Sequence, residues 1–194
     1  EVLLMDKIKE DLTDVLEKLK KETFFGVEDP KIHPNVKVEF EYAPGKFVIL
    51  NEHPGLSEKS SLEMHFSEGY IVTSYEEKNA LTGKTKNFTS AEIKGLEKYG
   101  LLTNYFRRDP RYVIKNSKDI KETSPGVYCM VLWDESAKEL SNLNEETDGA
   151  MSDIIQCAEI YLENDNLKKM VVKTQFLKKS GIKERIFTDI EFIK

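Results

Sequence analysis

The stretch VKVEFEYAPGKFVIL, residues 36–50, decides the fold because it predicts two neighbouring strands and the turn that joins them. From Val36 to Tyr42, apolar residues alternate with charged ones, as a strand with one buried face requires. Residues 43–46, Ala-Pro-Gly-Lys, match a type II turn, in which proline presets φ and the following glycine takes a positive φ. Residues 47–50 return as the second strand, so the stretch predicts an antiparallel hairpin.

Similar strand-like runs lie on the C-terminal side of this hairpin. A second hairpin is predicted where residues 61–66 and 70–75 flank the polar turn Ser-Glu-Gly. The run 127–133 is apolar at consecutive positions, which indicates a strand covered on both faces and therefore a central place in the sheet. The other predicted strands are residues 112–115, 170–177 and 185–193.

The first segment is an amphipathic helix, predicted over residues 3–24. Its apolar residues recur at spacings of three and four: Met5, Ile8, Leu12, Val15 and Leu19. Gly26 is expected to supply the C-terminal cap of this helix. Since the apolar stripe is too short for a coiled coil, we expect the helix to dock peripherally on the protein's own sheet.

Two further helices complete the predicted fold. Residues 89–92, Thr-Ser-Ala-Glu, form a capping box that opens a short middle helix, which Gly100 closes. Apolar residues at helical spacing predict a third helix near residues 148–163. We therefore expect an α+β fold, with the helices packed on a mainly antiparallel sheet, in a single domain of residues 1–194.

The composition limits the compartments and partners that the chain can have. Its formal charge of −6 and pI of about 5.3 argue against nucleic-acid binding, because affinity for phosphate backbones depends on Lys and Arg. No run approaches the roughly 20 apolar residues of a membrane span, and no signal peptide is visible. Cys129 and Cys157 lie in apolar runs, as buried free thiols in a reducing compartment do. We expect a cytoplasmic protein that is a monomer or a weak dimer.

Residues 79–85, NALTGKT, end in the Gly-Lys-Thr of a phosphate-binding loop. Such a loop needs another glycine five residues before the glycine of that triplet, but Lys78 holds this position. It also needs a helix that starts at once, whereas the next helix signal waits until Thr89. We therefore expect an ordinary turn and no nucleotide cofactor.

Metal sites receive little support from the sequence. If Asn144 is the first residue of a calcium loop, Gly149 takes the glycine position, but Ile155 stands where a bidentate Glu should close the cage. Asp148 is better explained as the N-cap of the predicted helix that follows. The histidines show no paired metal-ligand spacing: His33, His53 and His65. We predict no metal, no cofactor and no catalytic constellation.

The distribution of charge along the chain is more informative than any motif. Residues 134–165 hold ten acids and one base, for a net charge of −9. Residues 166–185 have a net charge of +6, and residues 105–121 have one of +4. These segments either neutralise one another within the fold or form separate surfaces that steer a charged partner. The arginines and aromatic residues of 105–121 suit an anionic ligand or an acidic protein surface.

The leading hypothesis is a non-catalytic protein-binding module, such as an inhibitor, an immunity-type protein or an adaptor. Its charged surfaces would recognise another protein, with binding that weakens as salt rises. The alternative is an enzyme or a small-ligand-binding domain with a pocket between the sheet and the helices. A weaker alternative is binding of single-stranded nucleic acid through residues 105–121. The predicted binding residues are Tyr105, Arg107, Arg108, Arg111, Tyr112, Glu145, Glu146 and Asp148.

Overall fold

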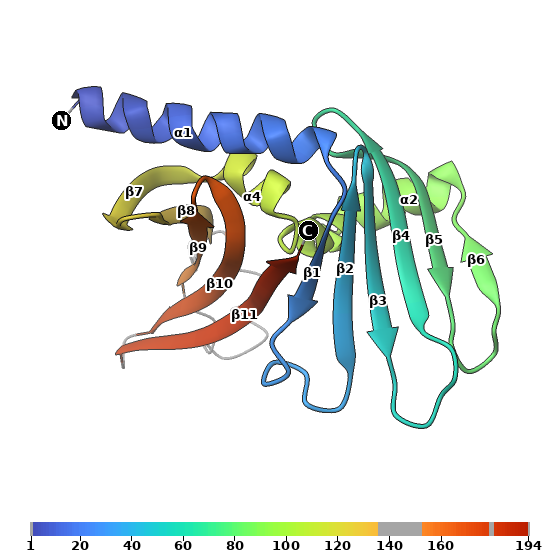
Figure 1. Cartoon of the computed structure of the whole chain (residues 1–194). Helices are drawn as coiled ribbons and strands as arrows, with labels where there is room; N and C mark the ends of the chain where they lie inside the picture. The colour runs from blue at the N-terminus through green and yellow to red at the C-terminus, as the bar shows by residue number, and fades with distance from the viewer. Residues whose placement is uncertain (1, 136–152, 179–180, 194) are drawn as a thin grey trace.

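The computed structural model describes residues 2–135, 153–178 and 181–193, which form helices and strands in the order shown in Figure 1. The helices are α1 (Val2–Lys21), α2 (Ser90–Lys98), α3 (Leu101–Phe106) and α4 (Pro110–Asn116). The strands before α2 are β1 (Phe24–Glu28), β2 (Lys37–Ala43), β3 (Lys46–Glu52), β4 (Ser60–Ser67), β5 (Ile71–Lys78) and β6 (Thr85–Asn87). The strands after α4 are β7 (Lys118–Ser124), β8 (Val127–Glu135), β9 (Asp153–Glu163), β10 (Asn166–Lys178) and β11 (Gly181–Ile193).

The strands of the described residues belong to one 11-stranded antiparallel sheet with the order β6-β5-β4-β3-β2-β1-β11-β10-β9-β8-β7. Strands that follow one another in the chain are neighbours, except that β6 and β7 lie at opposite edges and β1 pairs with β11. The first and last strands therefore join the two halves of the sheet at its middle. The connection between the edges contains α2, α3 and α4, and Figure 1 shows the sheet curving around it, with α1 across one end.

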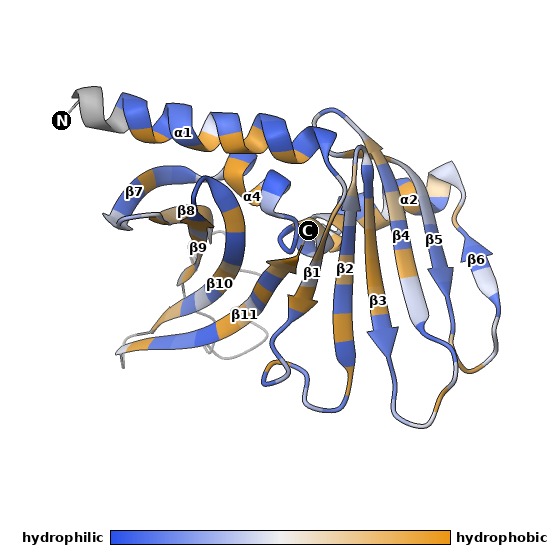
Figure 2. Cartoon of the chain, viewed as in Figure 1, coloured by the Kyte–Doolittle hydropathy of each residue, from blue (hydrophilic) through white to orange (hydrophobic). Residues whose placement is uncertain are grey.

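One face of the sheet is apolar and forms the core with the helices. The apolar stripe of α1 is turned toward the sheet in Figure 2, and Leu12 within it is only 2% exposed. On the sheet, Tyr42 stacks on Phe24 and Phe47 with ring centroids 4.6 and 5.1 Å apart, and Phe47 stacks on Phe106 of α3 at 6.4 Å. Aromatic side chains thus fill the middle of the concave face.

A buried ion pair fixes α4 to this face. Asp109 caps α4 by accepting a hydrogen bond from the backbone N–H of Arg111, and its carboxylate lies 2.9 Å from the Arg111 guanidinium. The same guanidinium donates to the carbonyl oxygens of Ala43 and Lys46, at 2.6 and 3.0 Å. These two residues flank the turn between β2 and β3, so the arginine holds the helical segment against the first hairpin of the sheet.

The structure confirms the α+β class and several of the helices and strands that the sequence predicted. Both hairpins form as β2–β3 and β4–β5, and Gly45 has the positive φ of 65° that the first turn requires. Thr89 and Glu92 form both hydrogen bonds of the capping box that opens α2. Gly100, at φ 69°, separates α2 from α3. Of the helices in the described part of the chain, none has an apolar stretch long enough to cross a bilayer.

The predicted helix near residues 148–163 is wrong over the residues that the structure describes, because β9 occupies 153–163. Ile154, Ala158 and Leu162 are spaced by four, which satisfies a helical period but also a period of two. The observed burial decides between them, since Gln156 and Ile160 are buried on the same face of the strand. Residues 148–152 lie outside the described part of the chain.

The predicted strand at 112–115 is also wrong, because these residues belong to α4. The Asp109 cap and Pro110 in the first turn start a helix there, and Pro favours this position since it has no N–H to leave unbonded. The predicted strand 127–133 is confirmed as β8, but its central place is not, because β8 is second from the edge. The edge strand beside it, β7, was not predicted.

The first helix ends earlier than predicted, at Lys21, and Phe24 begins β1. Gly26 lies inside this strand and is not a helix cap. A Cβ atom at this position would lie 2.6 Å from Cγ2 of Ile190 on β11. Gly26 is therefore explained by the close approach of the first and last strands.

Candidate functional site

A pocket of about 740 Å³ opens at the ends of β3, β4, β5 and β6 that lie away from α1 (Figure 1). Its walls come from the connection between β3 and β4, the turn between β5 and β6, and the adjoining ends of those strands. The lining residues are Asn51, His53, Leu56, Ser60, Ser61, Leu62, Glu77, Lys78, Asn79, Ala80, Leu81, Lys84, Thr85 and Lys86.

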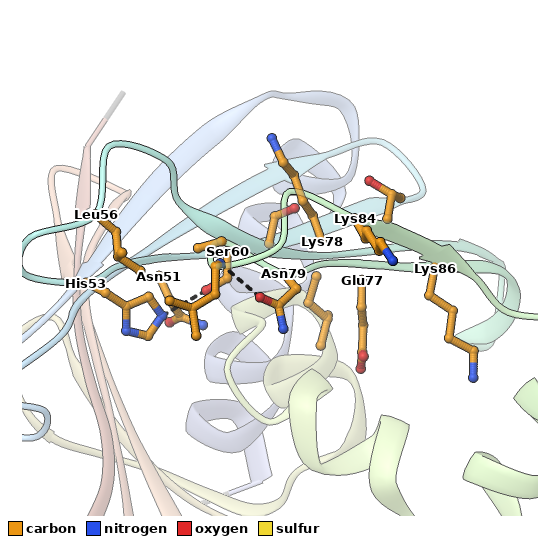
Figure 3. Close-up of a pocket in the computed structure, with 14 residues that line it drawn as sticks. Asn51, His53, Leu56, Ser60, Glu77, Lys78, Asn79, Lys84 and Lys86 are labelled. Atoms are coloured by element: carbon orange, nitrogen blue, oxygen red, sulfur yellow. Dashed lines mark hydrogen bonds between the residues drawn. The ribbon is translucent and has the colours of Figure 1, made fainter.

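The pocket lies where the inner face of the sheet changes from apolar to polar. On β3 the buried apolar positions end at Ile49, and Asn51 is the next residue on that face. Asn51 pairs with Ser60 on β4, and Glu77 on β5 pairs with Lys86 on β6. Figure 3 shows the Glu77 and Lys86 side chains on the side of the strands that faces the helices. The sheet register therefore assembles polar groups from strands that are distant in sequence.

Glu77 is held in place by a tyrosine from the core. The Tyr75 hydroxyl donates a hydrogen bond of 2.5 Å to Oε1 of Glu77. Burial, reinforced by this hydrogen bond, raises the pKa of Tyr75 far above its ordinary value, so the hydroxyl stays protonated and remains a donor. No described residue hydrogen-bonds the other carboxylate oxygen, Oε2, which leaves it as an acceptor for a ligand.

The lysines of the pocket have different surroundings. Lys86 lies 2.9 Å from Oε2 of Glu92, the glutamate of the capping box that opens α2. Lys84 is exposed and has no ion-pair partner among the described residues. Lys78 points to the opposite side of the strands in Figure 3 and pairs with Glu58 at 3.5 Å. Lys84 is thus the pocket lysine whose charge no described acid pairs, whereas Lys86 and Lys78 are each paired with a glutamate.

The pocket also contains a hydrogen-bonded histidine–serine pair and two leucine side chains. Nε2 of His53 lies 2.9 Å from the Ser60 hydroxyl. Leu56 and Leu62 supply apolar surface to the lining. Among the described residues, no carboxylate hydrogen-bonds the second ring nitrogen of His53, so the third group of a catalytic triad is missing. The described residues also contain no cluster of three or more metal-ligating side chains.

The stretch NALTGKT forms a turn, as predicted, although part of it lines the pocket. The side-chain oxygen of Asn79 accepts hydrogen bonds from the N–H groups of Leu81 and Thr82. The backbone carbonyl of Asn79 accepts a further hydrogen bond from the N–H group of Gly83. These N–H groups are the ones that a phosphate-binding loop would offer to its ligand. Because they are already bonded and β6 follows instead of a helix, the turn does not form a phosphate cradle.

The arginines predicted to bind a partner lie elsewhere: Arg111 is buried, and Arg107 and Arg108 are partly buried. Arg111 is only 2% exposed, and its guanidinium is engaged with Asp109 and backbone carbonyls. Arg108 donates to the carbonyl of Asn104 at 3.1 Å and stacks on Phe187 of β11 at 4.3 Å. Burial lowers the pKa of Arg108. Both side chains fix the helical segment to the sheet.

The other predicted binding residues do not line the pocket either. Arg107 stacks on Trp133 at 4.7 Å, and Tyr112 stacks on Phe106 at 5.8 Å. Tyr105 is half-buried against the core. The structure therefore brings the five residues from 105–112 together around α3 and α4, where they contribute to packing. Glu145, Glu146 and Asp148 lie outside the described residues, as does most of the calcium-loop stretch 144–155.

The charged segments meet in the sheet. Across the β9–β10 hairpin, Glu163 pairs with Lys168 at 3.3 Å and Glu159 pairs with Lys173 at 3.0 Å. Each pair joins the acidic segment 134–165 to the basic segment 166–185. Over the described residues, these segments neutralise each other in part, as one of the two sequence interpretations expects.

The pocket was not predicted from the sequence, because residues such as His53 and Glu77 lie more than twenty positions apart in the chain. The signal in the sequence was the alternation of side chains along each strand. Asn51 is the next residue after Ile49 on the inner face of β3, and Glu77 is the next after Tyr75 on that of β5. Polar residues that end apolar alternation in neighbouring hairpins fall at the same end of the sheet. That signal identifies a wall of the pocket, although not its depth.

The sequence matches no family model, and no curated protein is significantly similar to it. The pocket is therefore interpreted from its own chemistry.

Proposed function

We propose that this chain is a binding domain that holds a small polar ligand in the pocket at the ends of β3–β6. The observation that carries this proposal is the convergence of Glu77, Lys86 and Lys84 on one pocket of about 740 Å³. This volume lies within the range of roughly 300–1,000 Å³ that small-molecule sites occupy. The proposal keeps the small-ligand part of the alternative hypothesis from the sequence, but the pocket is lined by strand ends and turns and does not lie between the sheet and the helices.

The lining chemistry favours a hydroxylated ligand that carries a negative charge. Oε2 of Glu77 accepts hydrogen bonds from ligand hydroxyls, since Oε1 is occupied by Tyr75. Lys84 supplies positive charge for a carboxylate or phosphate group, and the Lys86 ammonium, although paired with Glu92, has further N–H donors for it. Leu56 and Leu62 cover the carbon skeleton. A sugar acid or a sugar phosphate meets all three requirements.

Titration calorimetry with glucuronate as the anionic probe tests this function, with glucose and glucosamine as neutral and cationic controls. Glucuronate is expected to bind more tightly than either control. Lys84→Ala should weaken glucuronate binding by roughly five- to tenfold, the cost of one charge-assisted contact. Lys7→Ala is the matched control, because Lys7 is an exposed lysine of α1 that does not line the pocket, so its loss should leave the affinity unchanged.

Two results would contradict the proposal. One is equal affinity for glucuronate, glucose and glucosamine, which would remove the charge argument. The other is equal weakening by Lys84→Ala and Lys7→Ala, which would reflect the net charge of the surface and not the pocket.

Protein recognition by an inhibitor, immunity-type protein or adaptor stays a prediction, and so does the proposal that the chain is cytoplasmic. The cytoplasmic proposal is supported by the free state of Cys129 and Cys157. These residues lie on neighbouring strands but are not directly opposite, since Cys129 faces Glu159 and Cys157 faces Val131. Thiol titration of protein isolated from its cell would find both cysteines reduced.

A further inference from the structure

The outer face of the sheet exposes apolar side chains where the first and last strands meet. Phe25 of β1 lies directly opposite Ile193 of β11, and these residues are 44% and 56% exposed. Val27 and Leu50 are half-buried on the same face. Together with Glu41, they line a shallow groove of about 320 Å³, called the outer groove below. Large apolar side chains that gather on an exposed face are typical of an interaction surface.

Carboxylates border the outer groove. Glu41 lies across from Phe25 on β2, and Glu191 lies across from Val27 on β11. Neither carboxylate has an ion-pair partner among the described residues. Glu39, which lines the groove together with Glu41, is shared between Lys37 and Lys59 at 3.2 and 3.6 Å. The outer groove therefore combines an apolar centre with two carboxylates at its border that form no ion pair among the described residues, although Lys169 lies opposite Glu191 on β10.

This charge selects the kind of partner. A second copy of the chain would bring Glu41 and Glu191 against the same acids, and like charges across an interface cost affinity. Nucleic acids and anionic lipid surfaces would be repelled for the same reason. Strand addition is also excluded at β1, since its backbone already pairs with β2 and β11. The partner must therefore contact side chains and must be positively charged.

We propose that the outer groove docks a segment of another protein, one that carries an apolar anchor flanked by Lys or Arg. The anchor packs between Phe25 and Ile193, and the basic residues pair with Glu41 and Glu191. This site lies on the outer face of the sheet and does not depend on the ligand pocket, which faces the helices.

The test uses a fluorescent amphipathic peptide with leucine on one face and lysine on the other, and a second peptide with glutamate in place of lysine. Anisotropy should show binding of the lysine peptide only, and the affinity should fall as salt rises. Glu41→Lys and Ile193→Ser should each weaken binding at least about tenfold. Glu97→Lys is the matched control, because it makes the same charge change at an exposed position on α2.

Circular dichroism of each variant checks that the fold is kept. Equal weakening by Glu41→Lys and Glu97→Lys would overturn the proposal, since the peptide would then respond only to net charge. Binding of the glutamate peptide, or of vesicles rich in phosphatidylserine, would also overturn it. A dimer of the wild type that Ile193→Ser dissociates in analytical ultracentrifugation would show that a second copy occupies the groove instead.

Discussion

At the scale of single residues, Glu28 is a buried acid inside the sheet. Its side chain is on the inner face at the end of β1 and is only 4% exposed. The Thr188 hydroxyl donates to Oε2 of Glu28, whereas Oε1 has no hydrogen-bond partner among the described residues. Burial raises the pKa of Glu28 from its ordinary value of 4.5 to about 7, although the Thr188 hydrogen bond and the Arg108 charge oppose the rise. The folded protein therefore binds this proton more tightly than the unfolded chain does.

Glu28 should make the protein less stable as pH rises from about 4.5 to 7. A carboxyl with a raised pKa stabilises the fold only while it is protonated, so its contribution is complete below 4.5 and is lost through 7. The loss is at most roughly 3 kcal/mol in the free energy of unfolding. Glu28→Gln should remove this part of the pH dependence in urea unfolding. Exposed Glu97→Gln is the control, and the same pH slope in both variants would contradict the assignment.

Residue types alone did not reveal which arginines are available to a partner. Arg107, Arg108 and Arg111 form a basic run with aromatic neighbours, which is typical of a binding surface. Arg111 can be buried because Asp109, two residues earlier, supplies a negative charge and the residues that flank the β2–β3 turn supply two carbonyl acceptors. That turn is more than sixty positions away in the sequence. A contact of this range cannot be inferred from one sequence without a pairing scheme for the strands.

At the scale of elements, strands with alternating polarity and capped helices were predictable. The hairpin 36–50 and the Thr89 cap each combine a local pattern with specific turn or cap residues. The strand at 153–163 was not predictable, because its apolar residues fit a helical period as well as the period of two of a strand. Only pairing with β8 and β10 selects the strand. Residues 110–116 were misassigned since the helix there is short and its apolar positions, Val113 and Ile114, are adjacent.

Gly26→Ala tests the placement of β1 beside β11. The added methyl would overlap Cγ2 of Ile190 at 2.6 Å, so we expect the free energy of unfolding to fall by about 1–3 kcal/mol. Ile190→Ala removes the overlapping atom, so the double variant should lose less stability than the two single variants together. Gly95→Ala in α2 is the control and should stabilise the protein slightly, because nothing lies within 4 Å of its added Cβ. Strict additivity of Gly26→Ala and Ile190→Ala would contradict the contact.

At the scale of the whole molecule, the order of the strands determines where a ligand can bind. Pairing of β1 with β11 makes one continuous curved sheet, and α2–α4 with their aromatic neighbours fill its concave centre. Polar side chains of β3–β6 are then left at the open ends of the strands, away from α1. The α+β class followed from the sequence, but this position did not, since it depends on the register between hairpins and on the connection between the sheet edges.

The most direct test of the ligand site is an NMR titration of the ¹⁵N-labelled protein with glucuronate. Chemical-shift changes should saturate and should be concentrated in residues 51–62 and 77–86, which surround the pocket. Strands β8–β11 and the outer groove at Phe25 should show no shift changes, because neither borders the pocket. Shifts centred on Arg107 and Arg108, or no saturable shifts at all, would contradict the proposed binding function.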